Sequence, residues 1–187
     1  YRGSASMANL FLEKTPENPK GPPLPHPTSA DVIQVAAGFR EYHGRKLDGF
    51  GLLAPSRENR NFLGVLFPSA LFPGRAPGGG ALLSFFFGGR RNLSGLKYTD
   101  RALAAEIGKI LQNDFGVNTA PDLLRIFRYK GAIPQYDSGT PVLRAMIEKI
   151  ESQYAGLHLL GNVRDGIGLP DRIVQAVSFA RKEFDGT

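Results

Sequence analysis

"FLGVLFPSALFPGRAPGGGALLSFFFGG", residues 62–89, decides the fold. Short runs rich in Val, Leu and Phe stand at either end, and Pro and Gly punctuate the segment between them. Apolar runs bounded in this way predict β-strands. The intervening segment is too short for a crossover helix, so the two strands are expected to pair antiparallel as neighbours. Residues 82–87 are apolar at almost every position, which predicts a strand covered on both faces.

Two further strands are predicted on the N-terminal side of this segment. They are "VIQVAAGF" at 32–39 and "GFGLLA" at 49–54. The spacers are again too short for crossover helices, so residues 31–98 are expected to form one antiparallel sheet in which consecutive strands pair as a meander.

From residue 99 the apolar spacing becomes helical. A helix is predicted over residues 99–116, a strand over 123–129, a helix from 140, a strand over 157–160 and a last helix after it. Thr140 and Pro141 suit the start of the second helix. The predicted class is α+β: an antiparallel or mixed sheet with a few flanking helices, followed by a terminal strand, loop and helix. The predicted apolar faces are Leu103, Ile107, Ile110 and Leu111 in the first helix, Leu143, Met146, Ile147 and Ile150 in the second, and Ile173, Ala176, Val177 and Ala180 in the last.

Composition excludes several classes of protein. The 187 residues carry a net charge of +6 and no Cys, so disulfide frameworks and Cys-based metal sites do not exist here. The basic residues are scattered, which favours a basic surface over a nucleic-acid site. The three His residues share no helix face, so no metal site is predicted. Residues 1–30 are rich in Pro and are expected to form an extended or mobile lead.

The sequence predicts neither a membrane span nor a targeting signal. No apolar run approaches the roughly 20 residues that a membrane span needs, and no signal peptide opens the sequence. A cytoplasmic location is therefore expected, with peripheral membrane association of a longer parent protein left open.

"GLHLLGNVRDGIGLPDRIVQA", residues 156–176, is the candidate functional segment. A predicted strand meets a loop with three glycines, and a helix follows at once. The unpaired N–H groups of a helix start, with little side chain in front of them, can hold an anion or a polarised ring. The same glycines also suit a tight connection that needs positive φ. Spacing alone favours neither interpretation.

Several segments together resemble the FAD-dependent protoporphyrinogen oxidases, within the flavin amine oxidase superfamily. The resemblance covers about residues 31–182. It rests on "KLDGFGLLAP", on the strand pair joined by "LFPGRAP", on "RYKGAIPQYD" and on the segment 156–176, which occur in the family's order.

The resemblance implies a domain organisation. Residues 31–156 would be the sheet and helices of a substrate domain, and residues 157–187 the last strand, loop and helix of an FAD-binding domain. The family's N-terminal G-x-G-x-x-G unit has no counterpart in these 187 residues. The partners implied are a tetrapyrrole substrate and that missing N-terminal part, and this chain alone is expected to be inactive and not to retain FAD.

The resemblance also implies which residues contact the flavin. Gly161 and Asn162 fall on the family's G-N pair, and the loop that follows faces the pyrimidine end of the ring. Tyr129 stands where the family usually has Trp. Arg164 and Asp165 in the same loop would face either the ring or solvent. The complete set is Gly161, Asn162, Gly166, Ile167, Gly168, Leu169 and Tyr129.

The expected chemistry is hydride transfer from a porphyrinogen to the flavin, in which the cofactor carries the difficult step. No carboxylate or His stands out as a general base, so no catalytic residue is assigned. Two alternatives stay open: a non-catalytic binding or interaction module that retains the fold, and another member of the flavin amine oxidase superfamily.

Overall fold

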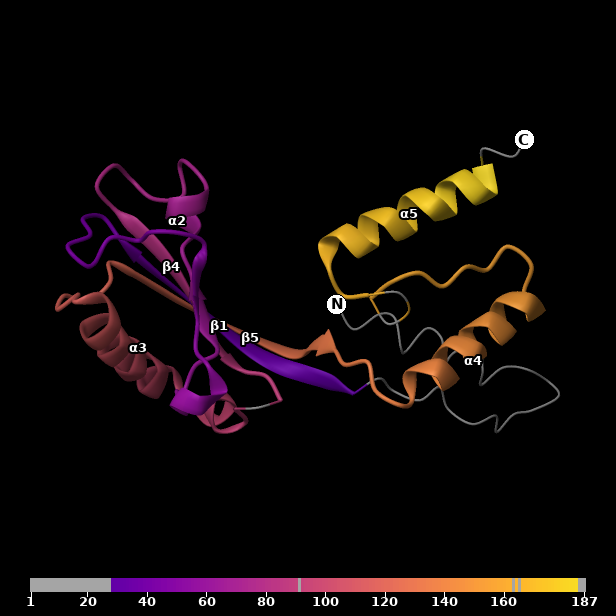
Figure 1. The fold of residues 1–187 in the computed structure, drawn as a ribbon, viewed down its shortest axis with the longest axis horizontal. Helices are drawn as coiled ribbons and strands as arrows, with labels where there is room; N and C mark the ends of the chain where they lie inside the picture. The colour runs from indigo at the N-terminus through magenta and orange to yellow at the C-terminus, as the bar shows by residue number, and fades with distance from the viewer. Residues whose placement is uncertain (1–27, 91, 163, 165, 185–187) are drawn as a thin grey trace. The chain divides into compact units, whose positions relative to one another are not determined.

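The computed structural model describes residues 28–90, 92–162, 164 and 166–184. The described residues form a five-stranded sheet with helices (Figure 1), and the strand order across the sheet is β2-β3-β4-β1-β5. The predicted α+β class is confirmed. The elements in chain order are β1 (Ser29–Phe39), β2 (Gly51–Leu53), η1 (Ser56–Glu58), β3 (Gly64–Leu66), α2 (Pro68–Leu71), β4 (Ala81–Gly88), η2 (Ser94–Lys97), α3 (Asp100–Phe115), β5 (Leu123–Pro134), α4 (Thr140–Gln153) and α5 (Leu169–Phe184).

The predicted strand pair of residues 62–89 is present. β3 and β4 are antiparallel neighbours, with Val65 opposite Phe85. The Pro- and Gly-rich segment that joins them contains only the short helix α2. β2 pairs antiparallel with β3 in the same way.

The meander prediction is wrong for β1, which pairs with β4 and not with β2. The β1–β4 ladder runs antiparallel from Val32 opposite Gly88 to Phe39 opposite Ala81. β2 has three residues, none of them buried, whereas β1 and β4 are long and largely buried. Pairing the two long apolar strands at the centre buries more apolar area than pairing β1 with a short edge strand would.

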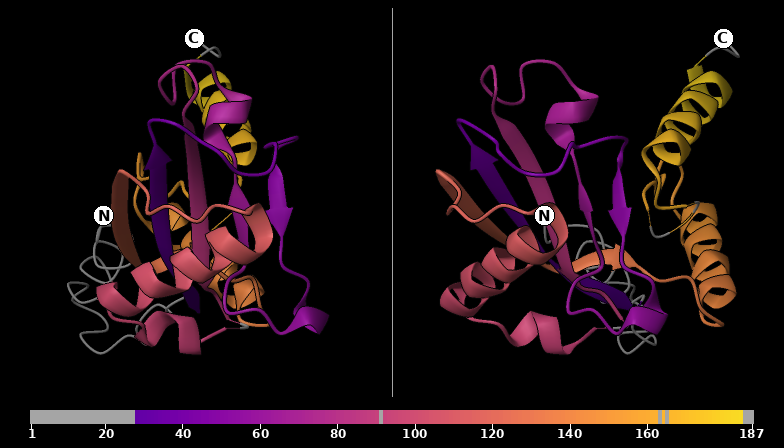
Figure 2. Two further views of the ribbon diagram at one scale, coloured as in Figure 1. Left: turned by 90° about the vertical axis from the view of Figure 1, so that its left-hand side faces the viewer. Right: turned by 60° about the vertical axis from the view of Figure 1, so that its left-hand side comes forward.

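The core lies between this sheet and α3, which crosses one face of the sheet in Figure 2. Phe85 on β4 is fully buried and meets Phe115 of α3 edge to face at 6.3 Å. All four residues of the predicted α3 stripe are buried. Thr99 caps the helix by accepting from the Ala102 N–H, and Gly116 ends it with φ +69°. The helix therefore begins and ends where the sequence analysis placed it.

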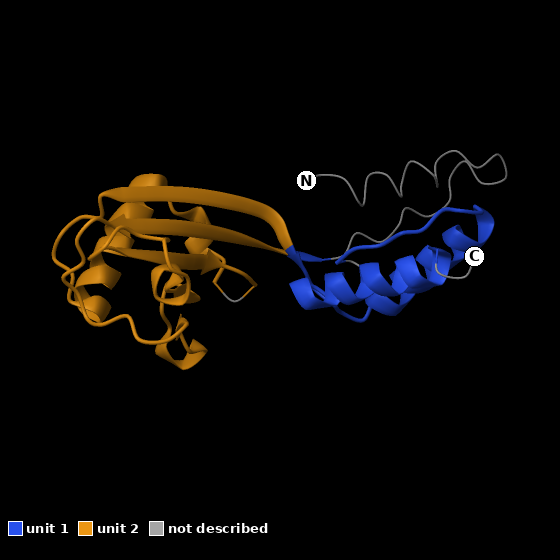
Figure 3. Ribbon diagram, turned by 90° about the horizontal axis from the view of Figure 1, so that it is seen from above, with its two compact units in different colours: residues 1–29, 133–187 blue, residues 30–132 orange. Residues whose placement is uncertain are grey.

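The chain divides into two compact units, coloured separately in Figure 3. We call residues 30–132 the sheet unit, and residues 28–29 and 133–184 the helical unit. The boundary lies at residue 133, whereas the sequence analysis placed one at residue 157. Leu157 and Leu159 pack on the buried side of α4, so α4 belongs with the segment that follows it. The assignment of either part to a substrate domain or an FAD-binding domain stays a prediction.

The helical unit corrects two expectations. Leu143, Ile147 and Ile150 of α4 are buried as predicted, but α5 has no buried residue within the described part of the chain. Residues 157–160 form no strand, because no described strand lies beside them to complete a ladder. The terminal element is an extended segment, a loop and a helix. The predicted lead, residues 1–30, lies almost wholly outside the described residues.

Candidate functional site

The glycine-rich loop 161–168 leads directly into α5. Gly161 has φ +137° and Gly166 has φ +105°, both in the region that favours glycine. The N–H of Arg172 bonds to the carbonyl of Gly168 at 3.2 Å and closes the first helical turn. Pro170 sits within that turn, where its missing N–H costs nothing. The loop thus presents backbone, with few side chains, at the start of a helix.

Gly161 and Gly166 share a positive φ but differ in their surroundings. Among the described residues, a Cβ at Gly161 would meet nothing within 4 Å. A Cβ at Gly166 would lie 2.5 Å from Oδ2 of Asp171. The positive φ favours glycine at both positions, and at Gly166 the contact with Asp171 is a second reason for it. The described surroundings of Gly161 leave room for the close approach of a ligand.

Asp171 caps the start of α5. Its Oδ2 accepts a hydrogen bond from the Gly168 N–H at 3.0 Å. A carboxylate in the first turn also complements the helix dipole. One backbone donor of the loop is thus already used, and a negative charge stands at the helix start.

Tyr136 joins the two ends of the loop. Its hydroxyl donates to the carbonyl oxygen of Asn162 at 2.7 Å and accepts from the Gly166 N–H at 2.6 Å. Sequence reasoning quoted this tyrosine in "GAIPQYD" but gave it no role. Its position in the segment that carries the family resemblance was the signal that could have drawn attention to it.

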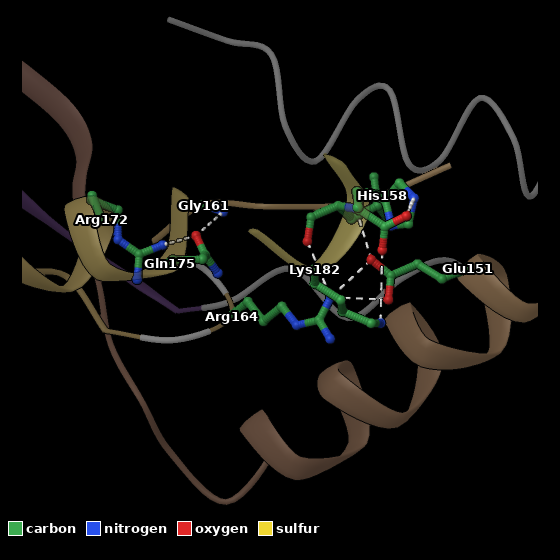
Figure 4. A network of polar contacts seen from close by, with 9 residues as sticks. Glu151, His158, Gly161, Arg164, Arg172, Gln175 and Lys182 are labelled. Carbon is green, nitrogen blue, oxygen red and sulfur yellow. Dashed lines mark hydrogen bonds and ion pairs between the residues drawn. The ribbon is translucent and has the colours of Figure 1, made fainter. Parts of the chain in front are cut away.

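Arg164 points toward α4, as Figure 4 shows. Its Nη1 contacts both carboxylate oxygens of Glu151, at 2.8 and 2.9 Å, and the carbonyl oxygen of Leu159 at 3.3 Å. Glu151 Oε1 also accepts from the Leu159 N–H at 2.8 Å. The two charged side chains are mostly buried, so Arg164 anchors the loop to α4. The alternative that Arg164 faces the ring or solvent is not what the structure shows, and Asp165 lies outside the described residues.

Gln175 of α5 holds the other end of the loop. Its Oε1 accepts from the Gly161 N–H at 2.9 Å and from Nη1 of Arg172 at 2.7 Å (Figure 4). The side chains of Glu151 and Gln175 therefore accept hydrogen bonds from backbone N–H groups of the extended segment. In a sheet, the carbonyl oxygens of a neighbouring strand would accept these bonds. This local satisfaction explains how residues 157–161 can run extended without a ladder.

Tyr129 belongs to β5 in the sheet unit, apart from the other predicted site residues, which all lie in the helical unit. Its ring stacks on Phe127 at 6.4 Å with 17° between the planes, and both rings are half exposed. The neighbours Leu124 and Ile126 pack instead against the core that α3 covers. Because side chains alternate along a strand, Tyr129 lies on the opposite face of the sheet.

The loop fits a planar group with polar edges better than a metal ion. Within the described residues no cluster of three His, Cys, Asp or Glu side chains could hold a metal. The open space at Gly161 and the helix start behind Leu169 suit contact through backbone groups. The exposed side chains of Ile167 and Leu169 add apolar surface beside them.

No helix in the described ranges is long and apolar enough to cross a membrane.

Comparison with known proteins gives a consistent relationship. No family model matches the sequence. The chain is 33% identical over 151 residues to protoporphyrinogen oxidase 2, chloroplastic/mitochondrial, of Arabidopsis thaliana, covering 79% of this chain and 30% of that protein. It is 32% identical over 140 residues to the mitochondrial protoporphyrinogen oxidase of Nicotiana tabacum, covering 73% and 28%. Coproporphyrinogen III oxidase of Bacillus subtilis (strain 168) is 25% identical over 149 residues, with 79% of this chain and 32% of that protein covered.

A solved structure supports the fold. The crystal structure of a candidate protoporphyrinogen oxidase from Exiguobacterium sp. 255-15 matches with a TM-score of 0.71 at 20% identity, over 95% of this chain and 39% of that chain. The chain spans about 30% of the length of the curated relatives it matches. Taken with the glycine-rich loop and the order of the matching segments, these findings make the chain a relative of the C-terminal part of the protoporphyrinogen oxidases.

Proposed function

We propose that this chain is the C-terminal part of an FAD-dependent enzyme that oxidises a porphyrinogen to a porphyrin, with protoporphyrinogen as the substrate. The proposal is supported by relatives named protoporphyrinogen oxidases and by one named coproporphyrinogen III oxidase. A reduced tetrapyrrole is the substrate class these names share. The relatives contain a further part that this chain does not span. We use the term full-length form for a protein that contains both this chain and that further part.

The single observation that carries the proposal is the backbone-lined loop at the start of α5. Gly161 leaves space for close approach, and the first turn of α5 directs N–H groups outward. We propose that the loop backbone holds one polar edge of the isoalloxazine ring. The loop residues concerned are Gly161, Asn162, Gly166, Ile167, Gly168 and Leu169. When bound, FAD supplies the hydride-accepting chemistry, and the loop orients the ring.

Asp171 sets an electrostatic limit on this arrangement. Its carboxylate lies at the same helix start, held by the Gly168 N–H. A negatively charged group bound at this helix start would meet the like charge of the carboxylate. The Asp171 carboxylate thus competes with the cofactor for the Gly168 N–H and for the positive end of the α5 dipole.

The open face of the sheet is the proposed tetrapyrrole-facing surface. Half-exposed Phe127 and Tyr129 stack there and offer a flat apolar platform of the kind that suits a planar macrocycle. Tyr129 keeps an aromatic ring where the family usually has Trp. We propose that it contributes to binding of the flavin or of the macrocycle through its ring.

The apolar side chains of α5 suit a polypeptide partner. Leu169, Ile173, Val174 and Val177 are all exposed on this helix. We propose that the part of the relatives that this chain does not span covers them and supplies the FAD pyrophosphate site. The expected cytoplasmic location, with peripheral membrane association of the full-length form, belongs to the same proposal.

The test is oxidation of porphyrinogens by the full-length form. Purified protein is assayed on protoporphyrinogen and on coproporphyrinogen, with and without added FAD, by the fluorescence of the porphyrin product. We expect FAD-dependent oxidation, faster with protoporphyrinogen. Faster oxidation of coproporphyrinogen would change the substrate. Absence of both activities and of bound flavin would favour the non-catalytic module.

A further inference from the structure

Among the described side chains that bind the backbone of the loop 161–168, Tyr136 binds it at two points. The Tyr136 hydroxyl uses both of its hydrogen-bonding functions on the loop, as donor to the Asn162 carbonyl and as acceptor from the Gly166 N–H. The two contacts are separated by four residues along the chain. One oxygen atom therefore fixes the distance between the beginning and the end of the loop.

We infer that Tyr136 is a positioning residue for the flavin, an inference that rests on the proposed function. By holding Asn162 and Gly166, it fixes the separation of these two points beside Gly161, where a Cβ would meet no described atom within 4 Å. Tyr136 also takes up the Gly166 N–H, while Asp171 takes up that of Gly168. The donors that reach a ligand are then those of Ile167 and of the first turn of α5.

The exposure and the position of Tyr136 indicate a role in the geometry of the loop and not in packing of the core. Its side chain is 44% exposed, and it follows directly on the end of β5, just before α4. The other anchors, Glu151 and Arg144, hold Arg164 in the middle of the loop through its side chain and its carbonyl. Only the phenol, among the described contacts, bonds to the backbone at residues 162 and 166 together. Removing one half-exposed hydroxyl should therefore change loop geometry more than folding.

The experiment compares Tyr136→Phe with Tyr98→Phe. Tyr98 is a matched control because its ring packs on Phe87 in the sheet unit, far along the chain from the loop. In the isolated chain, loss of the short hydrogen bond in Tyr136→Phe should move the Gly166 amide proton resonance upfield, and Tyr98→Phe should leave it in place. Thermal melting of both variants checks that the fold is retained.

In the full-length form, Tyr136→Phe should weaken FAD binding about tenfold, equivalent to ~1.4 kcal/mol, with a change in the visible spectrum of the flavin. Tyr98→Phe should bind FAD like the wild type. Unchanged FAD affinity and spectrum in Tyr136→Phe, or an unmoved Gly166 resonance, would overturn the inference. A wild-type full-length form that binds no FAD would overturn the proposed function and this inference with it, whatever the resonance shows.

Discussion

The sheet unit and the helical unit differ in how far they bury their apolar residues. In the sheet unit, β1, β3, β4 and α3 enclose a core whose central side chains, such as Phe85 and Leu103, are fully buried. In the helical unit the buried cluster has three members, all on α4, and α5 contributes none within the described residues. Among the described residues, the sheet unit therefore has the larger buried apolar core.

This difference in burial bears on the position of the candidate site. The glycine-rich loop belongs to the unit with the small core, and polar contacts through Tyr136, Glu151 and Gln175 hold it in place. A helix with an apolar, exposed side gains most of its stability from a partner that covers that side. The candidate site therefore lies in the unit whose described residues bury the smaller apolar core.

The largest expected effect is a difference in the free energy of unfolding between a substitution in the sheet unit and one in the helical unit. Phe85→Ala should lower the free energy of unfolding of the sheet unit by about 3–5 kcal/mol, because it opens a cavity against Phe115. Ile173→Ala on α5 should change stability by less than about 0.5 kcal/mol in the isolated chain, since this side chain is 56% exposed. Urea denaturation measures both. Equal losses in the two variants would show that α5 is packed and that the comparison is wrong.

A smaller effect tests the loop. Gly166→Ala should destabilise the helical unit by roughly 1–3 kcal/mol, because it combines positive φ with a Cβ against the Asp171 carboxylate. Gly156→Ala is the matched control, because Gly156 also has a positive φ, +78°, but a Cβ there would meet no described atom within 4 Å. The excess loss in Gly166→Ala, read from thermal melting, measures the clash together with the difference in φ between the two positions. Equal losses would mean that backbone strain explains both glycines.

The smallest effect is a pH dependence confined to the sheet unit. Burial raises the pKa of Tyr42 above its ordinary value of 10.0. Because the fold favours the neutral phenol, this contribution to stability is fully present below the ordinary pKa and is lost as the pH rises through the raised one. Unfolding free energy should therefore fall as the pH rises above about 10. Tyr42→Phe should fall less over that range, and identical pH profiles would show that another group causes the decline.

The sequence predicted the elements of the sheet unit better than their pairing. Apolar runs and Gly/Pro punctuation located β3 and β4 and the turn between them, and helical spacing located α3 with its caps. The partner of β1 escaped prediction, because local spacing favours neighbours in sequence. Only the length and burial of β1 and β4, compared across the chain, show that they belong together at the centre.

The candidate site was predictable as a segment but not as a set of contacts. Glycine content identified the loop, yet the surroundings of two glycines in it differ, which the sequence does not reveal. Tyr136 and Glu151 are 25 and 10 residues before Gly161, and nothing in the local pattern links them to the loop. The predicted strand at 157–160 failed because a strand is defined by a partner, and pattern alone does not supply one.

The central claim is that the loop before α5 contacts a flavin that this chain does not hold alone. The most direct measurement is the flavin content of two purified proteins, residues 1–187 and the full-length form, by absorbance and by quenching of FAD fluorescence on titration. We predict that the 187-residue chain is colourless and leaves FAD fluorescence unquenched, whereas the full-length form is yellow with stoichiometric FAD. Stoichiometric flavin on the isolated chain, or a full-length form that binds none, would contradict the account.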